Sequence, residues 1–217
     1  MRPEFPVLRA GLAVLLLVPC ALLAALVVGG WGPLHAFDQS VTDGLHEQAH
    51  AGSALTTAMT WWTNIFQPNV FRAAALGLVI WLVRRGERRT ALWVAVTMVA
   101  GGLLGGLLKL LIGRERPEFL DPVASAVGYA FPSGHALNSA LGLAVFVVIF
   151  PRVKALWVAA VVIPVMTAIS RVVLGVHWTS DVVAGLLLGV AVVVLTTRAF
   201  VRSPAGERMP QREAAQL

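Results

Sequence analysis

The chain has 217 residues, of which 58% are hydrophobic and 13% charged, and a formal net charge of +6. Soluble domains carry about 25% charged residues, so this composition excludes an ordinary soluble domain and indicates an integral membrane protein. A spanning helix needs roughly 20 residues, so the length suffices for one bundle of spans and leaves no room for a second folded domain. The single cysteine, Cys20, excludes an intramolecular disulfide.

Six apolar stretches predict an all-α, polytopic membrane bundle with about six transmembrane helices. Their bounds are Val7–Gly30, Val70–Val83, Thr90–Ile112, Gly134–Phe150, Ala155–Leu174 and Val182–Phe200. We expect the first stretch to remain as an uncleaved span. It is long for the apolar core of a signal peptide, and no clear small-residue cleavage site follows it.

Two amphipathic segments lie between the first and second stretches. The segment from His35 to His50 predicts a short helix on the membrane surface. Apolar residues recur at helical spacing in Ala54–Phe66, which also contains paired tryptophans of the kind found at membrane interfaces. This segment lengthens the short second stretch, and Pro68 is expected to kink or break the helix between them.

The distribution of basic residues predicts the orientation of the bundle. With Arg2 and Arg9 in the cytoplasm, alternation through six spans places most of the 17 basic residues on the cytoplasmic side, as the positive-inside rule requires. Both termini then lie in the cytoplasm. We expect the protein to lie in the inner (cytoplasmic) cell membrane. We assign residues 1–201 to one membrane domain and expect the polar tail 202–217 to be disordered. The basic residues outside this pattern are Arg72, Lys109, Arg114, Arg116 and Arg171.

Most of these exceptions gather at outer helix ends. Lys109 lies near the outer end of the third stretch, Arg116 follows with Arg114 beside it, and Arg171 lies near the outer end of the fifth stretch. A cation inside a span costs about 2.5–3.5 kcal/mol on insertion scales, so it usually marks a site. Arginine forks and lysine point charges both suit phosphate oxygens. The alternative is that these side chains only reach toward lipid headgroups.

A second polar block, Pro132-Ser133-Gly134-His135, begins the fourth stretch on the outer side. A helix N-terminus offers free N–H groups and a positive dipole end to an anion. Gly134 lets the backbone approach a ligand, and the Ser133 hydroxyl can add a donor. Ser133 could instead serve only as a helix cap. That alternative does not explain why His135 lies at the same face as the cations.

A third block places His177 and Asp181 four residues apart at the outer start of the sixth stretch. In a helical turn these positions share a face, so Asp181 can accept the Nδ1 proton and leave Nε2 free to attack. Alternatively, Asp181 only stabilises the helix start, and His177 is an interfacial ring beside Trp178. The three blocks supply an oriented base, a second histidine and several anion donors. The residues alone do not say which histidine attacks.

In order and in spacing, the three blocks resemble the full signature of the type 2 phosphatidic acid phosphatase family, whose relatives include vanadium-dependent haloperoxidases. The blocks are Lys109 to Arg116-Pro117, Pro132-Ser133-Gly134-His135, and Ser170-Arg171 to His177 and Asp181. No signature position departs from the pattern. The signature covers only the region from the first block to the last, and the six-span layout is similar to that of bacterial membrane members over nearly the whole chain.

The resemblance implies a role for each matching residue. His177 would be the nucleophile that forms a phosphohistidine, Asp181 would orient it, and His135 would be the general acid that later activates water. The residues that would bind the phosphoryl oxygens are Lys109, Arg116, Ser133, Gly134 and Arg171. We expect no metal or other cofactor, because these cations can neutralise the phosphate and no cluster of cysteines or carboxylates offers a metal site.

Small residues at spacings of four predict close helix packing and carry no chemistry in our interpretation. They are Gly101, Gly102, Gly105 and Gly106 in the third stretch, and Gly185 and Gly189 in the sixth.

We therefore expect an integral membrane phosphatase that hydrolyses a terminal phosphate monoester or pyrophosphate of a membrane lipid at the extracytoplasmic face. Its expected partners are the bilayer and the lipid substrate, with no nucleic acid. Candidate substrates are phosphatidylglycerophosphate, undecaprenyl pyrophosphate and phosphatidic acid, with selectivity in Phe37–Pro68 and Glu118–Phe131. The alternatives are a transporter or a non-catalytic lipid-binding relative, although transporters typically bind near the bilayer midplane. The sequence does not predict the oligomeric state.

Overall fold

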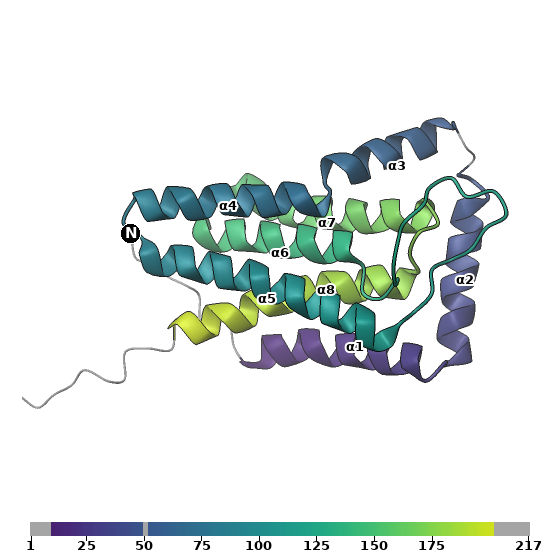
Figure 1. The fold of residues 1–217 in the computed structure, drawn as a ribbon, viewed down its shortest axis with the longest axis horizontal. Helices are drawn as coiled ribbons and strands as arrows, with labels where there is room; N and C mark the ends of the chain where they lie inside the picture. Colours follow the sequence, from purple (N-terminus) through teal and green to yellow (C-terminus); the bar gives the residue numbers. More distant parts are fainter. Residues whose placement is uncertain (1–9, 50–51, 202–217) are drawn as a thin grey trace, which may run out of the picture.

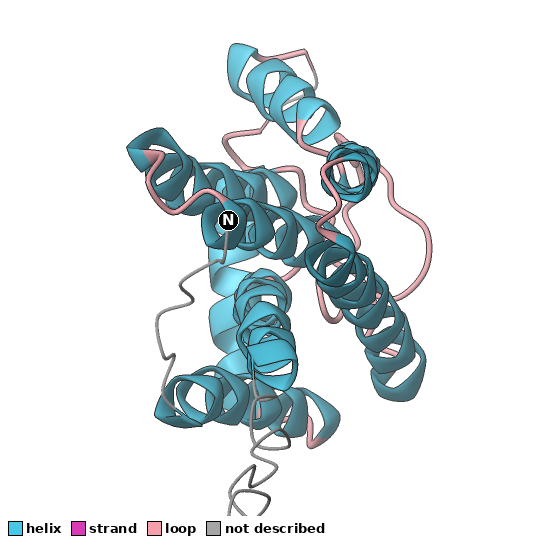
Figure 2. Ribbon diagram, turned by 90° about the vertical axis from the view of Figure 1, so that its left-hand side faces the viewer, coloured by secondary structure: helices cyan, strands magenta, loops and turns pink. Residues whose placement is uncertain are grey.

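The computed structural model describes residues 10–49 and 52–201, and every regular element within these ranges is an α-helix (Figures 1 and 2). The expected all-α class is therefore confirmed, while the tail 202–217 and the first residues of the first stretch lie outside the described ranges. The helices are α1 (Ala10–Val28), α2 (Gly32–His46), α3 (Ala54–Ile65), α4 (Pro68–Arg84), α5 (Arg88–Ile112), α6 (Gly134–Ile149), α7 (Lys154–Val173) and α8 (Thr179–Val201).

Apart from α2, the helices divide into long apolar segments and one shorter buried helix. By length and composition, α1, the α3–α4 segment, α5, α7 and α8 each qualify as a membrane span. Leucines such as Leu15 on α1 and Leu103 on α5 are exposed, as lipid-facing side chains are. The shorter helix α6 has 16 residues and packs against α4, α5, α7 and α8. The chain is therefore a multi-pass membrane protein built around α6.

The join between α3 and α4 is broken where Pro68 was expected to interrupt it. Helix α3 ends at Ile65, and Pro68 is the first residue of α4. Proline is well tolerated there because the first N–H groups of a helix have no intrahelical acceptor. Figure 1 shows α3 displaced from the line of α4, toward the end of the bundle that α2 crosses.

Helix α2 runs across one end of the bundle, nearly perpendicular to the spans (Figure 1). Its buried side chains are Asp38 and Thr42, whereas Phe37 and the N-cap residue Trp31 are exposed. This is the surface helix expected from the amphipathic pattern, although it ends at His46 rather than continuing to His50.

Glycines allow backbone-to-backbone packing around α6. A Cβ atom at Gly185 would lie 2.6 Å from the carbonyl oxygen of Ser133, and one at Gly189 would lie 2.6 Å from that of Leu137. A Cβ at Gly101 of α5 would meet an α6 side chain at 2.6 Å. A larger residue at Gly185 or Gly189 would push α8 away from α6, whereas at Gly101 the Leu141 side chain could move aside. The predicted close packing is therefore present at Gly101, Gly105, Gly185 and Gly189, but not at Gly102 and Gly106, where a Cβ would meet open space.

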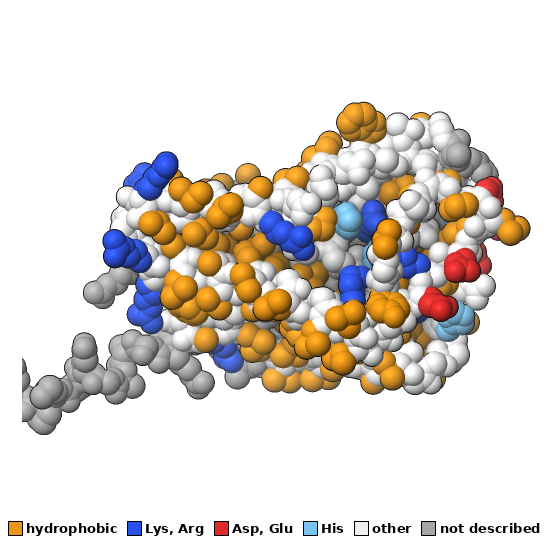
Figure 3. Space-filling view, viewed as in Figure 1, with side chains coloured by type: hydrophobic (Ala, Val, Ile, Leu, Met, Phe, Trp, Pro, Cys, Tyr) orange, Lys and Arg blue, Asp and Glu red, His pale blue; other side chains and the backbone are white. Residues whose placement is uncertain are grey.

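Basic side chains gather at the end of the bundle opposite α2 (Figure 3). They come from the turn between α4 and α5 and from the turn between α6 and α7, and they are exposed. These residues are Arg84, Arg85, Arg88, Arg89, Arg152 and Lys154. Clustering of exposed basic residues at one end of a bundle is the pattern that the positive-inside rule describes.

Candidate active site

The three polar blocks meet at the end of the bundle that α2 crosses. Helices α5 and α7 end there and α6 and α8 begin there, so residues from opposite helix ends become neighbours. Figure 3 shows Lys or Arg and His side chains together in a hollow at this end. The predicted residues that contribute are Lys109 on α5, Arg116 in the following loop, Ser133, Gly134 and His135 at the start of α6, Arg171 on α7, and His177 and Asp181 at the start of α8.

His177 is held from both sides of its ring. Its Nδ1 atom lies 3.4 Å from Oδ2 of Asp181, which also accepts the backbone N–H of Trp178 at 2.9 Å. Its Nε2 atom lies 3.1 Å from NH1 of Arg116. A guanidinium group can only donate, so Nε2 must be the acceptor and Nδ1 must carry the proton. The Nε2 lone pair therefore points toward the guanidinium group of Arg116, and the same positive charge would attract an anion to this position.

Burial keeps the imidazole of His177 neutral. The side chain is 2% exposed, and this desolvation lowers its pKa to about 4, although the hydrogen bond and the charge of Asp181 act in the opposite direction. The guanidinium groups of Arg116 and Arg171 lower the pKa further. At neutral pH the ring is thus uncharged and available as a nucleophile.

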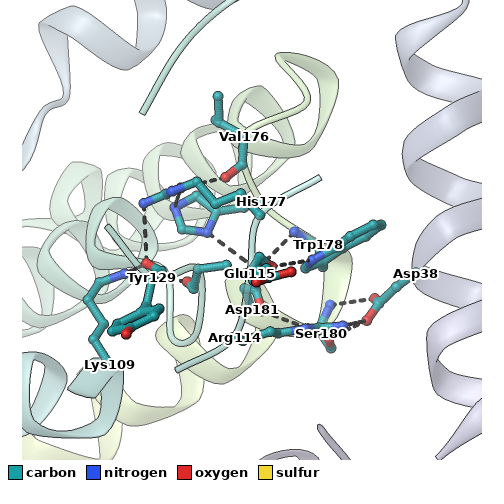
Figure 4. Close-up of polar contacts among 12 residues, drawn as sticks. Asp38, Lys109, Arg114, Glu115, Tyr129, Val176, His177, Trp178, Ser180 and Asp181 are labelled. Atoms are coloured by element: carbon teal, nitrogen blue, oxygen red, sulfur yellow. Dashed lines mark hydrogen bonds and ion pairs between the residues drawn. The ribbon is translucent and has the colours of Figure 1, made fainter. Parts of the chain in front are cut away.

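Loop carbonyls hold two of the cations. Arg116 donates to the carbonyl oxygens of Gly128 at 2.8 Å and Val176 at 2.5 Å. Lys109 donates through Nζ to the carbonyl oxygen of Tyr129 (Figure 4). The loop between α5 and α6 therefore holds both cations, and Arg116 lies beside His177.

Two buried donors at this site have no hydrogen-bond partner in the structure. Ser133 occupies the N-cap position of α6, yet its hydroxyl makes no capping bond, and Oγ is buried and unpaired. The Nε atom of Arg171 is likewise buried and unpaired, while its NH1 donates to Oγ1 of Thr63 at 3.2 Å. A Cβ at Gly134 would meet open space, so a ligand can approach this part of the backbone. Unpaired buried donors are costly and rare, so the site has the character of an anion pocket.

His135 lies in the first turn of α6 and is partly buried. Its ring is within electrostatic range of Arg171, Arg116 and Lys109, and of His177. The structure therefore brings all the predicted site residues to one place, with two histidines among several cations.

Three further residues join this site, none of them among the predicted site residues. Asp38 on α2 and Arg114 in the loop after α5 form an ion pair at 2.7 Å, and Arg114 also pairs with Asp181 at 2.7 Å. Thr63 on α3 contacts Arg171. Asp38 and Thr63 fall within the 37–68 range where selectivity was predicted, but no local pattern placed them at this site, because both reach it from helices far away along the chain. Arg114 was visible only as a neighbour of the other cations.

A cavity of about 600 Å³ adjoins the cations. Its walls include Arg116, Phe119, Tyr129 and Val176, so it lies largely within the 118–131 segment where selectivity was predicted. Within residues 10–49 and 52–201, no group of three or more His, Cys, Asp or Glu side chains could hold a metal ion.

Comparison with known proteins agrees with this geometry. Residues 90–204 match the PAP2 superfamily. The chain is 38% identical to the lipid A 1-phosphatase of Rhizobium johnstonii over 115 residues, which cover 49% of this chain and 46% of that protein. It is 32% identical to the undecaprenyl-diphosphatase of Sulfolobus acidocaldarius over 113 residues, which cover 50% of this chain and 54% of that protein. The match thus spans about half the length of these curated relatives.

The fold is also found in a solved structure. The crystal structure of a transmembrane PAP2-type phosphatidylglycerolphosphate phosphatase from Bacillus subtilis superposes with a TM-score of 0.76 at 25% sequence identity. The superposition covers 89% of this chain and 98% of that one. The resemblance noted from the three polar blocks is therefore confirmed, and the chain belongs to the PAP2 superfamily.

Proposed function

We propose that this protein is a membrane lipid phosphatase that removes a terminal phosphate from a phosphate monoester or pyrophosphate lipid through a phosphohistidine. The observation that carries the proposal is the placement of His177 between Asp181 and Arg116. Asp181 fixes the tautomer of the ring, and Arg116 marks where a phosphoryl group would meet the free Nε2 lone pair.

The reaction would proceed in two steps. Nε2 of His177 attacks phosphorus, the bond to the leaving oxygen breaks, and His135 gives that oxygen a proton. His135 then takes a proton from water, which attacks the phosphohistidine and releases inorganic phosphate. Splitting a difficult displacement into two steps is the usual benefit of covalent catalysis, and a positioned acid adds about 10²–10⁴-fold.

The donors around the histidines would stabilise the charge on the phosphoryl oxygens during both steps. Arg116, Arg171 and Lys109 supply positive charge, and the Ser133 hydroxyl and the Gly134 N–H supply neutral donors. Fixed donors of this kind usually make the largest single contribution to catalysis. Their number makes a metal unnecessary for neutralising the phosphate, so we propose a metal-independent reaction.

The proposed substrate class follows from the site and from the relatives. The site binds a terminal phosphate and leaves the rest of the lipid to the neighbouring surfaces, and the relatives include a lipid A 1-phosphatase and an undecaprenyl-diphosphatase. We rank undecaprenyl pyrophosphate and phosphatidylglycerophosphate first. The basic opposite end supports an active site on the extracytoplasmic face of the cell membrane.

The test is phosphate release by purified protein in detergent with EDTA, measured on phosphatidylglycerophosphate, undecaprenyl pyrophosphate and phosphatidic acid. We expect release from at least one lipid, loss of release in His177→Ala, and retention in the control Gln39→Ala, since Gln39 is exposed on α2. Lipid carrying a radiolabelled terminal phosphate should label the wild type with an alkali-stable, acid-labile bond. Folded protein that releases no phosphate from any lipid would favour a non-catalytic or transport role.

Sidedness has its own test. Ser125 is exposed in the loop that borders the cavity, whereas the native Cys20 is buried. A membrane-impermeant maleimide added to intact cells should label Ser125→Cys and not the wild type. Labelling only after the membrane is broken would place the site in the cytoplasm.

A further inference from the structure

Asp38 is a fully buried carboxylate far from the signature residues in the sequence. It lies on α2 with 0% exposure. Its Oδ1 accepts the backbone N–H of Ser180 at 2.9 Å, and its Oδ2 accepts the hydroxyl of Ser180 at 2.5 Å and NH2 of Arg114 at 2.7 Å. Buried carboxylates are costly unless they are paired and hydrogen-bonded, and both oxygens of Asp38 are satisfied.

Arg114 connects Asp38 to the nucleophile. Its NH1 donates to Oδ1 of Asp181 at 2.7 Å, while the other oxygen of Asp181 faces Nδ1 of His177. Figure 4 shows Asp38, Arg114 and Asp181 in sequence, from α2 to the start of α8. The guanidinium group thus lies between two carboxylates, of which only Asp181 belongs to the signature.

The charges of this chain of residues decide what Asp38 can do. Arg114 alone would neutralise much of the negative charge of Asp181, at 2.7 Å in a buried setting. Asp38 supplies a second negative charge on the other side of the guanidinium group. The set of Asp38, Arg114 and Asp181 therefore keeps one net negative charge beside the imidazole.

That charge matters when the histidine is phosphorylated. As the bond between Nε2 and phosphorus forms and the ester bond breaks, the ring of His177 gains positive charge while Nδ1 keeps its proton. A negative Asp181 stabilises this cation, and a neutralised Asp181 would do so less well.

We infer that Asp38 is a positioning residue for the proposed phosphatase reaction: it holds Arg114 and offsets its charge, so that Asp181 faces His177 as part of a set with one net negative charge. The inference rests on the proposed function and adds to it a residue from α2, outside the signature.

A purely structural role for Asp38 makes different predictions. Asp38 also accepts an N–H group at the start of α8, and an asparagine could still accept it through its side-chain oxygen. Asp38→Asn therefore keeps the capping bond and removes the charge that balances Arg114. If Asp38 only caps α8, this variant should behave like the wild type.

The experiment is a double-mutant cycle on full-length protein in detergent. We expect Asp38→Asn to lower kcat by about 10- to 100-fold with KM nearly unchanged, which is less than the ~10⁴-fold loss typical when the carboxylate that directly orients a histidine is removed. In the Asp181→Asn background the same change should lower the residual kcat by less than about twofold, because the residue through which it acts is gone. The matched control is Asp43→Asn, which removes another α2 carboxylate outside this chain of residues and should leave kcat unchanged.

A second variant tests the balance of charge directly. Arg114→Gln alone leaves Asp38 buried without its cation, whereas Asp38→Asn with Arg114→Gln removes both charges together. The double variant should therefore be more active than either single variant. Equal loss from Asp38→Asn in the wild-type and Asp181→Asn backgrounds, or no loss at all, would overturn the inference. Wild-type protein without phosphatase activity would instead overturn the proposed function, and thermal unfolding of each variant shows whether it folds.

Discussion

Replacing Gly185 with alanine should displace the start of α6, where the proposed phosphate-binding residues lie. A Cβ atom at this position would lie 2.6 Å from the carbonyl oxygen of Ser133 and 3.2 Å from the backbone nitrogen of Leu137. Carbon–oxygen contacts are ordinarily about 3.3 Å or longer, so the two helices must separate by roughly 0.7 Å. Because both atoms belong to the backbone, no side-chain rotation can relieve the overlap.

This displacement acts on the site as well as on the packing. The N–H of Ser133 donates to the carbonyl oxygen of Asp181 at 2.9 Å, so a shift of α6 moves the donors relative to His177. A misplacement of about 1 Å can cost about 100-fold in rate, and we expect kcat/KM of Gly185→Ala to fall by about 10- to 100-fold. Overpacking of this kind should also lower the free energy of unfolding by about 1–3 kcal/mol.

Two other alanine variants separate stability from positioning. A Cβ at Gly189 would make the same 2.6 Å overlap, with the carbonyl oxygen of Leu137 one turn away from the site, so Gly189→Ala should lose stability but less activity. Gly102 faces open space, so Gly102→Ala should change neither. The assays are steady-state phosphate release and thermal unfolding in detergent. The displacement of α6 would be refuted if Gly185→Ala kept the kcat/KM and the melting temperature of the wild type. It would also be refuted if Gly185→Ala and Gly189→Ala lost equal activity.

Further predictions concern single groups of the site. Thr63→Val removes the acceptor of a buried Arg171 donor, and such a hydrogen bond contributes about 1 kcal/mol. KM should therefore rise about fivefold in Thr63→Val and stay near the wild-type value in Thr63→Ser, and equal KM values for the two variants would contradict this. Because burial holds the pKa of His177 at about 4, protonation should abolish attack only as the pH falls through about 4, and an acid limb of kcat/KM near 6.5 would be inconsistent with that burial. Arg116→Lys replaces a planar fork with a point charge and should lower kcat/KM by at least about tenfold, whereas an unchanged value would mean that the fork does not bind the phosphoryl group.

The bundle was predictable because apolar stretches long enough to span a membrane are visible in composition alone. The bounds were less predictable where polar residues belong to a helix. Helix α8 begins at Thr179, three residues before the expected Val182. The expected start followed the apolar run, whereas the polar residues of the first turn also form helical backbone hydrogen bonds. The break at Pro68 was predictable because proline has a known preference for the first turn of a helix.

The site was predictable only as far as its residues lie in local blocks. The blocks end at helix termini that the topology brings to one end of the bundle, so their meeting follows from the alternation of the spans. Asp38 and Thr63 reach the site across 142 and 108 residues of sequence, and such contacts depend on how helices pack. Nothing in the sequence distinguishes Asp38 from the nearby Asp43, because both lie on one amphipathic helix and only the packing of α2 decides which is buried.

Helices α2 and α3 present one face to the site and another to the surroundings, which makes the predicted role of 37–68 in selectivity testable. Phe37 and Trp61 are 54% and 66% exposed, whereas their neighbours Asp38 and Thr63 are buried against the site. Exposed aromatic rings at the membrane surface can contact the lipid beyond its phosphate, while the buried residues act on groups that every substrate shares. Phe37→Ala and Trp61→Ala should therefore change the ranking of lipid substrates by KM and keep kcat on the best substrate. Asp38→Asn and Thr63→Val should weaken activity on all lipids by similar factors, and a change in ranking by either buried variant would mean that selectivity is set within the phosphate site itself.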